Sequence, residues 1–321
     1  MTRYQAVLFD LGGVVVSWEP ARAYASVLAP ELVADFMARI DFEAWNRSLD
    51  AGRAVTEGEQ ELIARHPQDA DAVLAYRRHF VATLTGLVPG TGAVIAELAA
   101  SGLRLAALTN WSAETFPVAR ERFGLLRRFE GVLVSGEERL AKPDPRIFTL
   151  ALDRFGFSAA TTVFVDDSPV NVAAASAVGL TAFAFTDAEQ LHADLVGLGL
   201  LAPRSPVEEP VFHLTERRHW EQARRECHYP WSSRDLGYEA EGFVHASFAT
   251  QLGPTRVRFF GDLADDDLVV LELDPGRLSS PLVVEDLGAG PFPHLYGPLD
   301  PAEVAAVHAF PLGQVAPGAE S

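Results

Sequence analysis

The stretch Ala-Val-Leu-Phe-Asp-Leu-Gly-Gly, residues 6–13, determines how the rest of the chain is interpreted. Four consecutive apolar residues indicate a short strand buried on both faces, which is typical of a parallel sheet. The run ends at Asp10, and two glycines follow, so the strand leads directly into a turn that carries a carboxylate. We therefore expect an α/β core whose first strand places a functional acid at its carboxyl end.

Four further apolar runs repeat this pattern up to about residue 201, separated by stretches of helical periodicity. Such an alternation predicts a doubly wound parallel sheet with helices on both faces. We assign residues 1–16 and 88–201 to this core. The expected strands are Ala6–Phe9, Leu103–Leu108, Gly131–Val134, Thr162–Val165 and Leu180–Phe185, and the expected helices are Thr91–Ala100, Glu114–Phe123, Pro145–Phe155 and Pro169–Val178.

Two breaks in the alternation predict further units. Residues 17–87 show helical periodicity and no convincing strand, which predicts a helical cap inserted after the first strand. The prolines within residues 202–209 predict a linker there. Beyond them we expect a compact α+β domain at 210–316 and a tail at 317–321. The expected strands of this domain are Val211–Leu214, Gly242–His245, Leu268–Leu273, Leu282–Glu285 and Ala306–Phe310.

Composition narrows the classes of partner and compartment. The 321 residues carry a net charge of −18, which disfavours nucleic acid and anionic membranes because both are polyanions. Cys227 is the only cysteine, which excludes an internal disulfide and a cysteine-built zinc site. No apolar run reaches the ~18 residues of a membrane helix, and the first residues lack a signal-peptide pattern. We expect a cytoplasmic protein of about two domains.

Chemically useful side chains stand at or just after the ends of four expected strands. They are Asp10, Thr109 with Asn110, Lys142, and Asp166 with Asp167. The carboxyl ends of parallel strands share one edge, so these groups are expected to meet. An aspartate can attack phosphorus, a hydroxyl and an amide can donate to phosphoryl oxygens, and a lysine can neutralise charge. Three converging carboxylates repel each other without a cation, and Mg²⁺ prefers such oxygen ligands.

Four segments of the chain resemble the motifs of the haloacid dehalogenase superfamily, in the family's order. They are Phe9-Asp10-Leu11-Gly12-Gly13-Val14, Leu108-Thr109-Asn110, Lys142-Pro143-Asp144 and Val165-Asp166-Asp167-Ser168. The resemblance covers about residues 3–201, and residues 17–87 look like the family's first type of cap. It implies a Mg²⁺-dependent phosphatase that hydrolyses a small phosphorylated metabolite through an aspartyl-phosphate intermediate.

The resemblance also implies a role for each matching residue. Asp10 is the nucleophile, Thr109 binds the phosphoryl group, and Lys142 stabilises charge. Asp167 is a direct metal ligand, and Asp166 binds the metal directly or through water. The close backbone approach that glycine permits makes the Gly12 carbonyl a further candidate ligand beside Asp10.

The chain departs from the family pattern at Gly12, where many family phosphatases carry an aspartate that acts as general acid and base. Such catalysis is worth ~10²–10⁴-fold in rate. Three alternatives follow. The substrate has a good leaving group, such as an anomeric or acyl phosphate; a cap residue, of which His79, Glu43 and Asp50 are candidates, supplies the proton; or the activity is weak or lost.

The main rival activity is that of a 2-haloacid dehalogenase. In that reaction an aspartate attacks carbon, displaces halide and needs no metal. Dehalogenases that resemble this fold replace the paired acids with other polar residues. Asp166 and Asp167 therefore favour the metal-dependent phosphatase, whereas Gly12, which lacks the second acid, slightly favours the dehalogenase.

The expected C-terminal domain contains a second group of candidate site residues, His213, Thr215, His245, His294 and Tyr296. A zinc site of three histidines would usually show closer spacing between two of its ligands. Residues 210–315 resemble a bacterial domain family of unknown function, which looks distantly like the ADP-ribosyltransferase fold. That resemblance implies a nucleotide or NAD as ligand, although the full catalytic set of those transferases is not seen.

Overall fold

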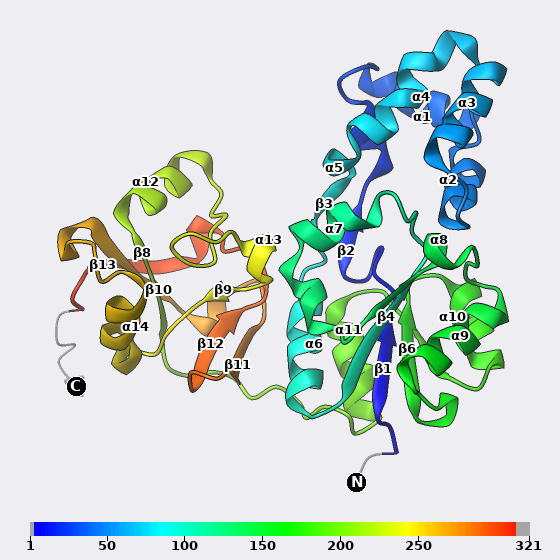
Figure 1. Cartoon of the computed structure of the whole chain (residues 1–321). Coiled ribbons are helices and arrows are strands. Elements are labelled where there is room, and N and C mark those ends of the chain that lie inside the picture. Colours follow the sequence, from blue (N-terminus) through cyan, green and yellow to red (C-terminus); the bar gives the residue numbers. More distant parts are fainter. Residues whose placement is uncertain (1–2, 313–321) are drawn as a thin grey trace.

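The computed structural model describes residues 3–312 and consists of a core, a cap above it and a C-terminal domain beside it (Figure 1). The expected tail at 317–321, and the end of the domain expected at 210–316, lie outside the described residues. Among the described residues, no helix is long and apolar enough to cross a membrane.

The core is built on a five-stranded sheet with the order β5-β4-β1-β6-β7, in which every neighbouring pair is parallel. Strand β1 lies in the centre, and all four of its residues are buried. The doubly wound α/β prediction is confirmed. The strands are β1 (Ala6–Phe9), β4 (Arg104–Thr109), β5 (Val132–Val134), β6 (Thr162–Asp166) and β7 (Thr181–Ala184).

Helices cover both faces of this sheet. Alternate residues of β1 point to opposite faces, so Val7 and Phe9 join one apolar cluster with α6 and α11, whereas Leu8 joins another with α9 and α10. Helix α9 has Asp144 as its N-cap and Pro145 as its first residue, which explains why it begins where the sequence predicts. The core helices are α6 (Thr91–Ala100), α7 (Phe116–Arg122), α8 (Ser135–Glu138), α9 (Pro145–Phe155), α10 (Pro169–Ala177) and α11 (Ala188–Gly197).

The cap is helical, but an antiparallel strand pair joins it to the core. This pair, β2 (Val16–Trp18) with β3 (Leu84–Leu87), corrects the expectation that residues 17–87 contain no strand. Both strands are too short to show a clear two-residue period. The cap elements are the 3₁₀ helix η1 (Pro20–Tyr24) and helices α1 (Pro30–Arg39), α2 (Phe42–Asp50), α3 (Val55–Arg65), α4 (Ala70–Arg78) and α5 (Phe80–Thr83).

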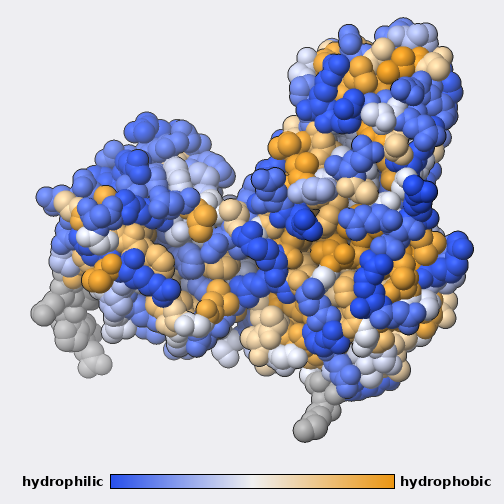
Figure 2. Space-filling model, in the orientation of Figure 1, coloured by the Kyte–Doolittle hydropathy of each residue, from blue (hydrophilic) through white to orange (hydrophobic). Residues whose placement is uncertain are grey.

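Aromatic packing links the cap to the core. Edge-to-face contacts run from Phe42 through Tyr76 and Phe80 to Trp111, which follows β4. Figure 2 shows that hydrophobic residues also gather over the core below the cap, whereas the C-terminal domain is mostly hydrophilic around α12 (Arg217–Glu226). The cap therefore packs on the edge of the sheet where the strands end.

The C-terminal domain is α+β, with two three-stranded antiparallel sheets. Strand β12 was not predicted, because two prolines interrupt its apolar pattern. The sheets have the orders β13-β10-β8 and β11-β12-β9. The elements are β8 (Val211–Glu216), α12 (Arg217–Glu226), α13 (Tyr238–Glu241), β9 (Val244–His245), α14 (Leu252–Phe259), β10 (Leu268–Leu273), β11 (Leu282–Asp286), β12 (Pro291–Leu295) and β13 (Val304–Ala309).

Ion pairs and apolar contacts join this domain to the core. Arg122 of α7 pairs with Glu239 of α13 at 2.6 Å. Arg128, in the 3₁₀ helix η3 (Gly124–Arg128), pairs with Glu285 of β11 at 3.1 Å. The Arg128 pair is largely buried, so the loss of either partner would leave a buried charge without its counter-ion.

Candidate active site

Lys142 connects two carboxylates at the carboxyl edge of the core sheet. Its Nζ lies 2.9 Å from Oδ1 of Asp10 and 2.6 Å from Oδ2 of Asp166, and its side chain is fully buried. Asp10 follows β1 and Asp166 ends β6, and the parallel pairing of these strands brings the two acids together. The backbone N–H of Leu11 also donates to Oδ1 of Asp10, at 2.7 Å.

The two neighbouring acids Asp166 and Asp167 have different surroundings. Asp166 is fully buried and accepts hydrogen bonds from the Ser168 backbone and from the Asn171 side chain, both at 2.9 Å. Asp167 is exposed. One oxygen each from Asp10, Asp166 and Asp167 lie within 4.8 Å of one another, which gives this site the oxygen donors of a divalent metal centre.

The electrostatics of the site fit a divalent cation. Burial raises the pKa of Asp10, and the charge of Asp166 raises it further against the opposing effect of Lys142. Burial and the charge of Asp166 also raise the pKa of Asp167. The two carboxylates hold the pKa of Lys142 above its usual value despite the burial of its side chain. A single lysine does not balance three acids, and a divalent cation would.

Thr109 and Asn110, at the end of β4, have separate roles. The Thr109 hydroxyl is buried and has no hydrogen-bond partner among the described residues, so it remains available to a bound group. The Asn110 side chain accepts from the Lys142 backbone N–H and donates to the Lys142 carbonyl, each at 2.9 Å. One N–H of the Asn110 amide thus binds Lys142 and helps to position it, and the expected donation from this amide to a phosphoryl oxygen remains a prediction.

The two glycines after Asp10 differ in what a side chain would meet. A Cβ at Gly13 would lie 2.4 Å from Oδ2 of Asp167, and the φ of Gly13 is +75°, so this position requires glycine. A Cβ at Gly12 would have no heavy atom within 4 Å. The absence of a second acid at Gly12 is therefore not imposed by packing.

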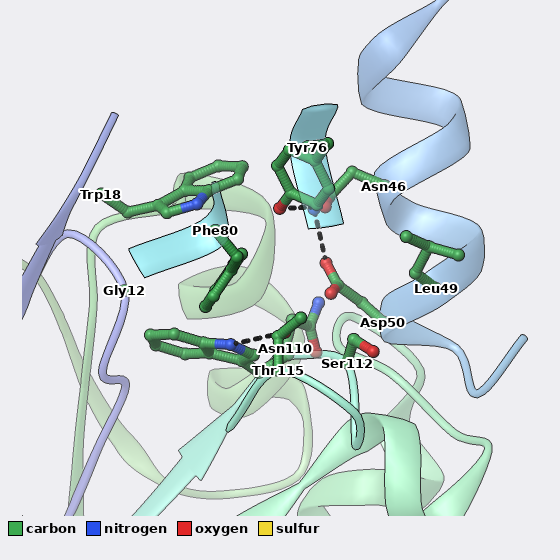
Figure 3. Close-up of a pocket in the computed structure, with 11 residues that line it drawn as sticks. Gly12, Trp18, Asn46, Leu49, Asp50, Tyr76, Phe80, Asn110, Ser112 and Thr115 are labelled. Carbon is green, nitrogen blue, oxygen red and sulfur yellow. Dashed lines mark hydrogen bonds between the residues drawn. The ribbon is translucent and has the colours of Figure 1, made fainter. Parts of the chain in front are cut away.

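A cavity of about 80 Å³ lies between the cap and the ends of the core strands (Figure 3). Gly12 and Asn110 of the core border it, together with Trp111, which follows Asn110. From the cap side it is lined by Trp18, Asn46, Leu49, Asp50, Tyr76 and Phe80. Sequence reasoning missed Asn46, since no motif marks it. Of the three cap candidates for a proton donor, only Asp50 lines this cavity.

None of the cavities described is lined by all five C-terminal candidates: His213 and His245 border one, and His245 and His294 border another. His213 is buried, with Nδ1 2.6 Å from the His245 carbonyl and Nε2 2.5 Å from the Tyr229 hydroxyl, which donates to Thr215 at 2.8 Å. Burial lowers the pKa of His213 to about 4. His213 and Thr215 thus belong to an internal network. The carboxylates of the core are the only group of three potential metal ligands found among residues 3–312, so the structure gives no support to a three-histidine zinc site.

His245 and His294 do lie together. Their rings are 5.0 Å apart, and they border a cavity of about 400 Å³ that also includes Glu241, Arg258 and Phe259. Nδ1 of His294 forms a hydrogen bond with Oε1 of Glu285 at 3.0 Å. Burial raises the pKa of Glu285. Hydrogen bonds from His294, from Arg128 of the core and from Tyr296 lower it more strongly, to about 2.

Tyr296 belongs to the interface between the domains. It is buried against Ala93 and Ala96 of α6 in the core, and its hydroxyl accepts a hydrogen bond from Arg128 at 2.9 Å. The sequence pattern does not show that α6 covers this face, and the expected role of Tyr296 in a C-terminal ligand site remains a prediction.

Comparison with protein families accounts for most of the chain. Residues 4–179 match the family model described as haloacid dehalogenase-like hydrolase. The chain belongs to the haloacid dehalogenase-like hydrolases. This hydrolase carries a second match at residues 214–307, to the family described as protein of unknown function (DUF952). The predicted resemblance of this domain to ADP-ribosyltransferases remains a prediction.

Individual relatives of this haloacid dehalogenase-like hydrolase are phosphatases. A sesquiterpene phosphatase from Aspergillus oryzae is 28% identical over 58% of this chain and 92% of its own. A phosphoglycolate phosphatase from Cupriavidus necator is 33% identical over 54% of this chain and 78% of its own. Among solved structures, a family enzyme from Bacteroides thetaiotaomicron in complex with magnesium and inorganic phosphate is 20% identical over 57% of this chain and 95% of its own, with a TM-score of 0.45.

Proposed function

We propose that this chain is a Mg²⁺-dependent phosphatase that hydrolyses a small phosphorylated metabolite through an aspartyl-phosphate on Asp10. The observation that carries the proposal is the junction of Asp10, Lys142 and Asp166 at one edge of the sheet. At the end of the neighbouring strand, the Thr109 hydroxyl has no hydrogen-bond partner within residues 3–312. Similarity to phosphatases that act on different substrates supports the reaction class and leaves the substrate open.

Asp10, Lys142 and Thr109 have different roles in this reaction. A carboxylate oxygen of Asp10 attacks phosphorus, a new O–P bond forms, and the bond from phosphorus to the leaving-group oxygen breaks. Water then attacks the phosphoryl group, which releases phosphate and restores the Asp10 carboxylate. Lys142 holds Asp10 in place and neutralises charge, and the Thr109 hydroxyl donates to a phosphoryl oxygen.

Asp10, Asp166, Asp167 and the Gly12 carbonyl are the groups that would hold Mg²⁺. When bound, the ion would neutralise charge on the phosphoryl oxygens and between the carboxylates. The exposed Asp167 is best placed to bind it directly, whereas Asp166 is already held by Lys142 and Asn171. The cytoplasmic location expected from the single cysteine remains a prediction.

The test is phosphate release from small phosphate esters, sugar 1-phosphates and acyl phosphates, with Mg²⁺ or with EDTA. Wild type is expected to depend on Mg²⁺, and Asp10→Asn to lose activity because the nucleophile is gone. Asp153→Asn changes an exposed acid on α9 and serves as the matched control. Full activity of Asp10→Asn would refute the proposal. Halide release from 2-haloacids that is insensitive to EDTA would instead establish the dehalogenase alternative.

A separate observation favours a binding function for the C-terminal domain. The cavity at His245 and His294 is large enough for a small molecule, and it combines aromatic walls with the cation of Arg258. We propose that it binds a small ligand, and the nucleotide or NAD class expected from the sequence is the first to examine. Calorimetric titration of the full chain with NAD and nucleotides should give saturable heat that Arg258→Ala weakens. No heat for wild type at millimolar ligand would exclude this class.

A further inference from the structure

Asp50 projects from the cap into the cavity that Gly12 borders from the core (Figure 3). It is the last residue of α2, and its carboxyl is partly exposed through this cavity. The other two candidates are placed differently. Glu43 has an exposed side chain paired with Arg47, and His79 is exposed at the end of α4. Neither of them lines the cavity.

Contacts from both the cap and the core hold Asp50 in this position. The Tyr76 hydroxyl donates to Oδ1 of Asn46 at 3.1 Å, which leaves the Asn46 amide to donate to Oδ2 of Asp50 at 3.0 Å. Ser135 of α8 donates to the backbone carbonyl of Asp50 at 2.6 Å. The core therefore holds the backbone of Asp50, and the cap residue Asn46 orients its carboxyl group.

The surroundings of Asp50 favour its protonated form. Burial raises its pKa to about 7, against the lowering effects of the Ser112 backbone and of the charge of Lys142. Its place at the C-terminal end of a helix acts in the same direction, because the helix dipole disfavours a negative charge there. The groups named around it comprise one cation, Lys142, and the neutral side chains of Asn46 and Tyr76.

We infer that Asp50 is the catalytic acid of this enzyme, and that the substrate is a phosphate ester of an unactivated, largely apolar alcohol. This inference rests on the proposed function. As the bond from phosphorus to the leaving oxygen breaks, the Asp50 carboxyl transfers its proton to that oxygen, and the alcohol and the Asp50 carboxylate result. The carboxylate then accepts a proton from the attacking water and is ready for the next turnover.

The walls of the cavity determine the kind of leaving group. Trp18, Leu49, Phe80 and Trp111 surround it with apolar surface. These four side chains favour a small apolar leaving group, and the hydroxyl residues Ser112 and Thr115 also line the cavity. An alcohol of this kind is a poor leaving group, so it needs the acid that Gly12 does not supply.

The test compares two substrates of matched size, n-butyl phosphate and butyryl phosphate. Butyrate leaves without a proton, whereas butanol requires one. Asp50→Asn retains the shape of the side chain and an acceptor for Asn46. In the first turnover it should slow butanol release by ~10²–10⁴-fold and butyrate release by less than about tenfold. Glu43→Gln, on the same helix, is the matched control and should leave both rates unchanged.

A second variant tests the geometry without removing anything from the core. Gly12→Asp has open space for its side chain and borders the same cavity. In the Asp50→Asn background it should restore butanol release at least about tenfold, since either position can present a carboxyl to the leaving oxygen. Such a rescue would show that the loss in Asp50→Asn is a loss of proton transfer.

The outcomes separate this inference from the proposed function. Equal slowing of both substrates in Asp50→Asn, or no slowing of either, would overturn the role of Asp50. Hydrolysis of butyryl phosphate but not of butyl phosphate by wild type would overturn the substrate class and the need for an acid. No phosphate release by wild type from these compounds or from the wider panel would overturn the proposed function itself.

Discussion

Asp50→Asn should stabilise the protein, and increasingly so as the pH rises. The folded-state pKa of Asp50 is about 7, above its ordinary value of 3.8. An acid with a raised pKa contributes most to stability when the pH lies below 3.8, and that contribution is lost as the pH rises through about 7. Asparagine has no charge to bury, so the variant avoids this loss.

The magnitude follows from the shift. About three pKa units at 1.36 kcal/mol each correspond to roughly 4 kcal/mol above pH 7. Solvent reaches Asp50 through the cavity, so we reduce the expected effect to about 2–4 kcal/mol. Between pH 5 and pH 8 the advantage of the variant should grow by about 1–3 kcal/mol. Asp10 also titrates, but it is present in both proteins and cancels in the comparison.

Thermal unfolding of wild type and variant at pH 5 and pH 8, in EDTA, measures this growth. At roughly 2–4 °C per kcal/mol for a domain of this size, the difference in Tm should widen by several degrees. Asp35→Asn, on an exposed position of α1, is the control and should show no such widening. A difference that is the same at both pH values, or that reverses at pH 8, would refute the reasoning about the buried carboxyl.

Two further predictions concern the interface and the metal site. Arg128→Ala should destabilise the chain by about 3–5 kcal/mol in urea unfolding, because Glu285 would remain buried without its cation; an unchanged midpoint would contradict this. Mg²⁺ at 100-fold over its Kd should stabilise wild type by about 2.7 kcal/mol, and Gly13→Ala should reduce this gain because its Cβ would displace Asp167. Equal Mg²⁺-induced shifts in Tm for Gly13→Ala and wild type would show that Asp167 does not bind the ion.

The elements of the core could be predicted from the sequence because local signals agree there. Ala6–Phe9, Thr91–Ala100 and Pro145–Phe155 have the predicted bounds. Strand burial, helix periodicity and caps are properties of neighbouring residues. Where those signals are weak, as in the three residues of Val16–Trp18 or the prolines of Pro291–Leu295, the strands were missed. Their pairing partners stabilise them, and those partners lie far away in the chain.

The candidate site also combines features that local sequence determines with features that depend on tertiary contacts. The sequence by itself determined that Asp10 and Asp166 converge, because parallel strands end at one edge of a sheet whatever side chains surround them. Lys142 lies beyond β5 and α8, and its contacts with Asn110 help to bring it to the same place. Only the tertiary structure decided that Asp50, rather than Glu43 or His79, reaches this site. That choice depends on how α2 is attached to α8, a contact between residues 85 positions apart. Likewise, no local pattern could show that Tyr296 packs on the core, since the surface that buries it lies in another domain.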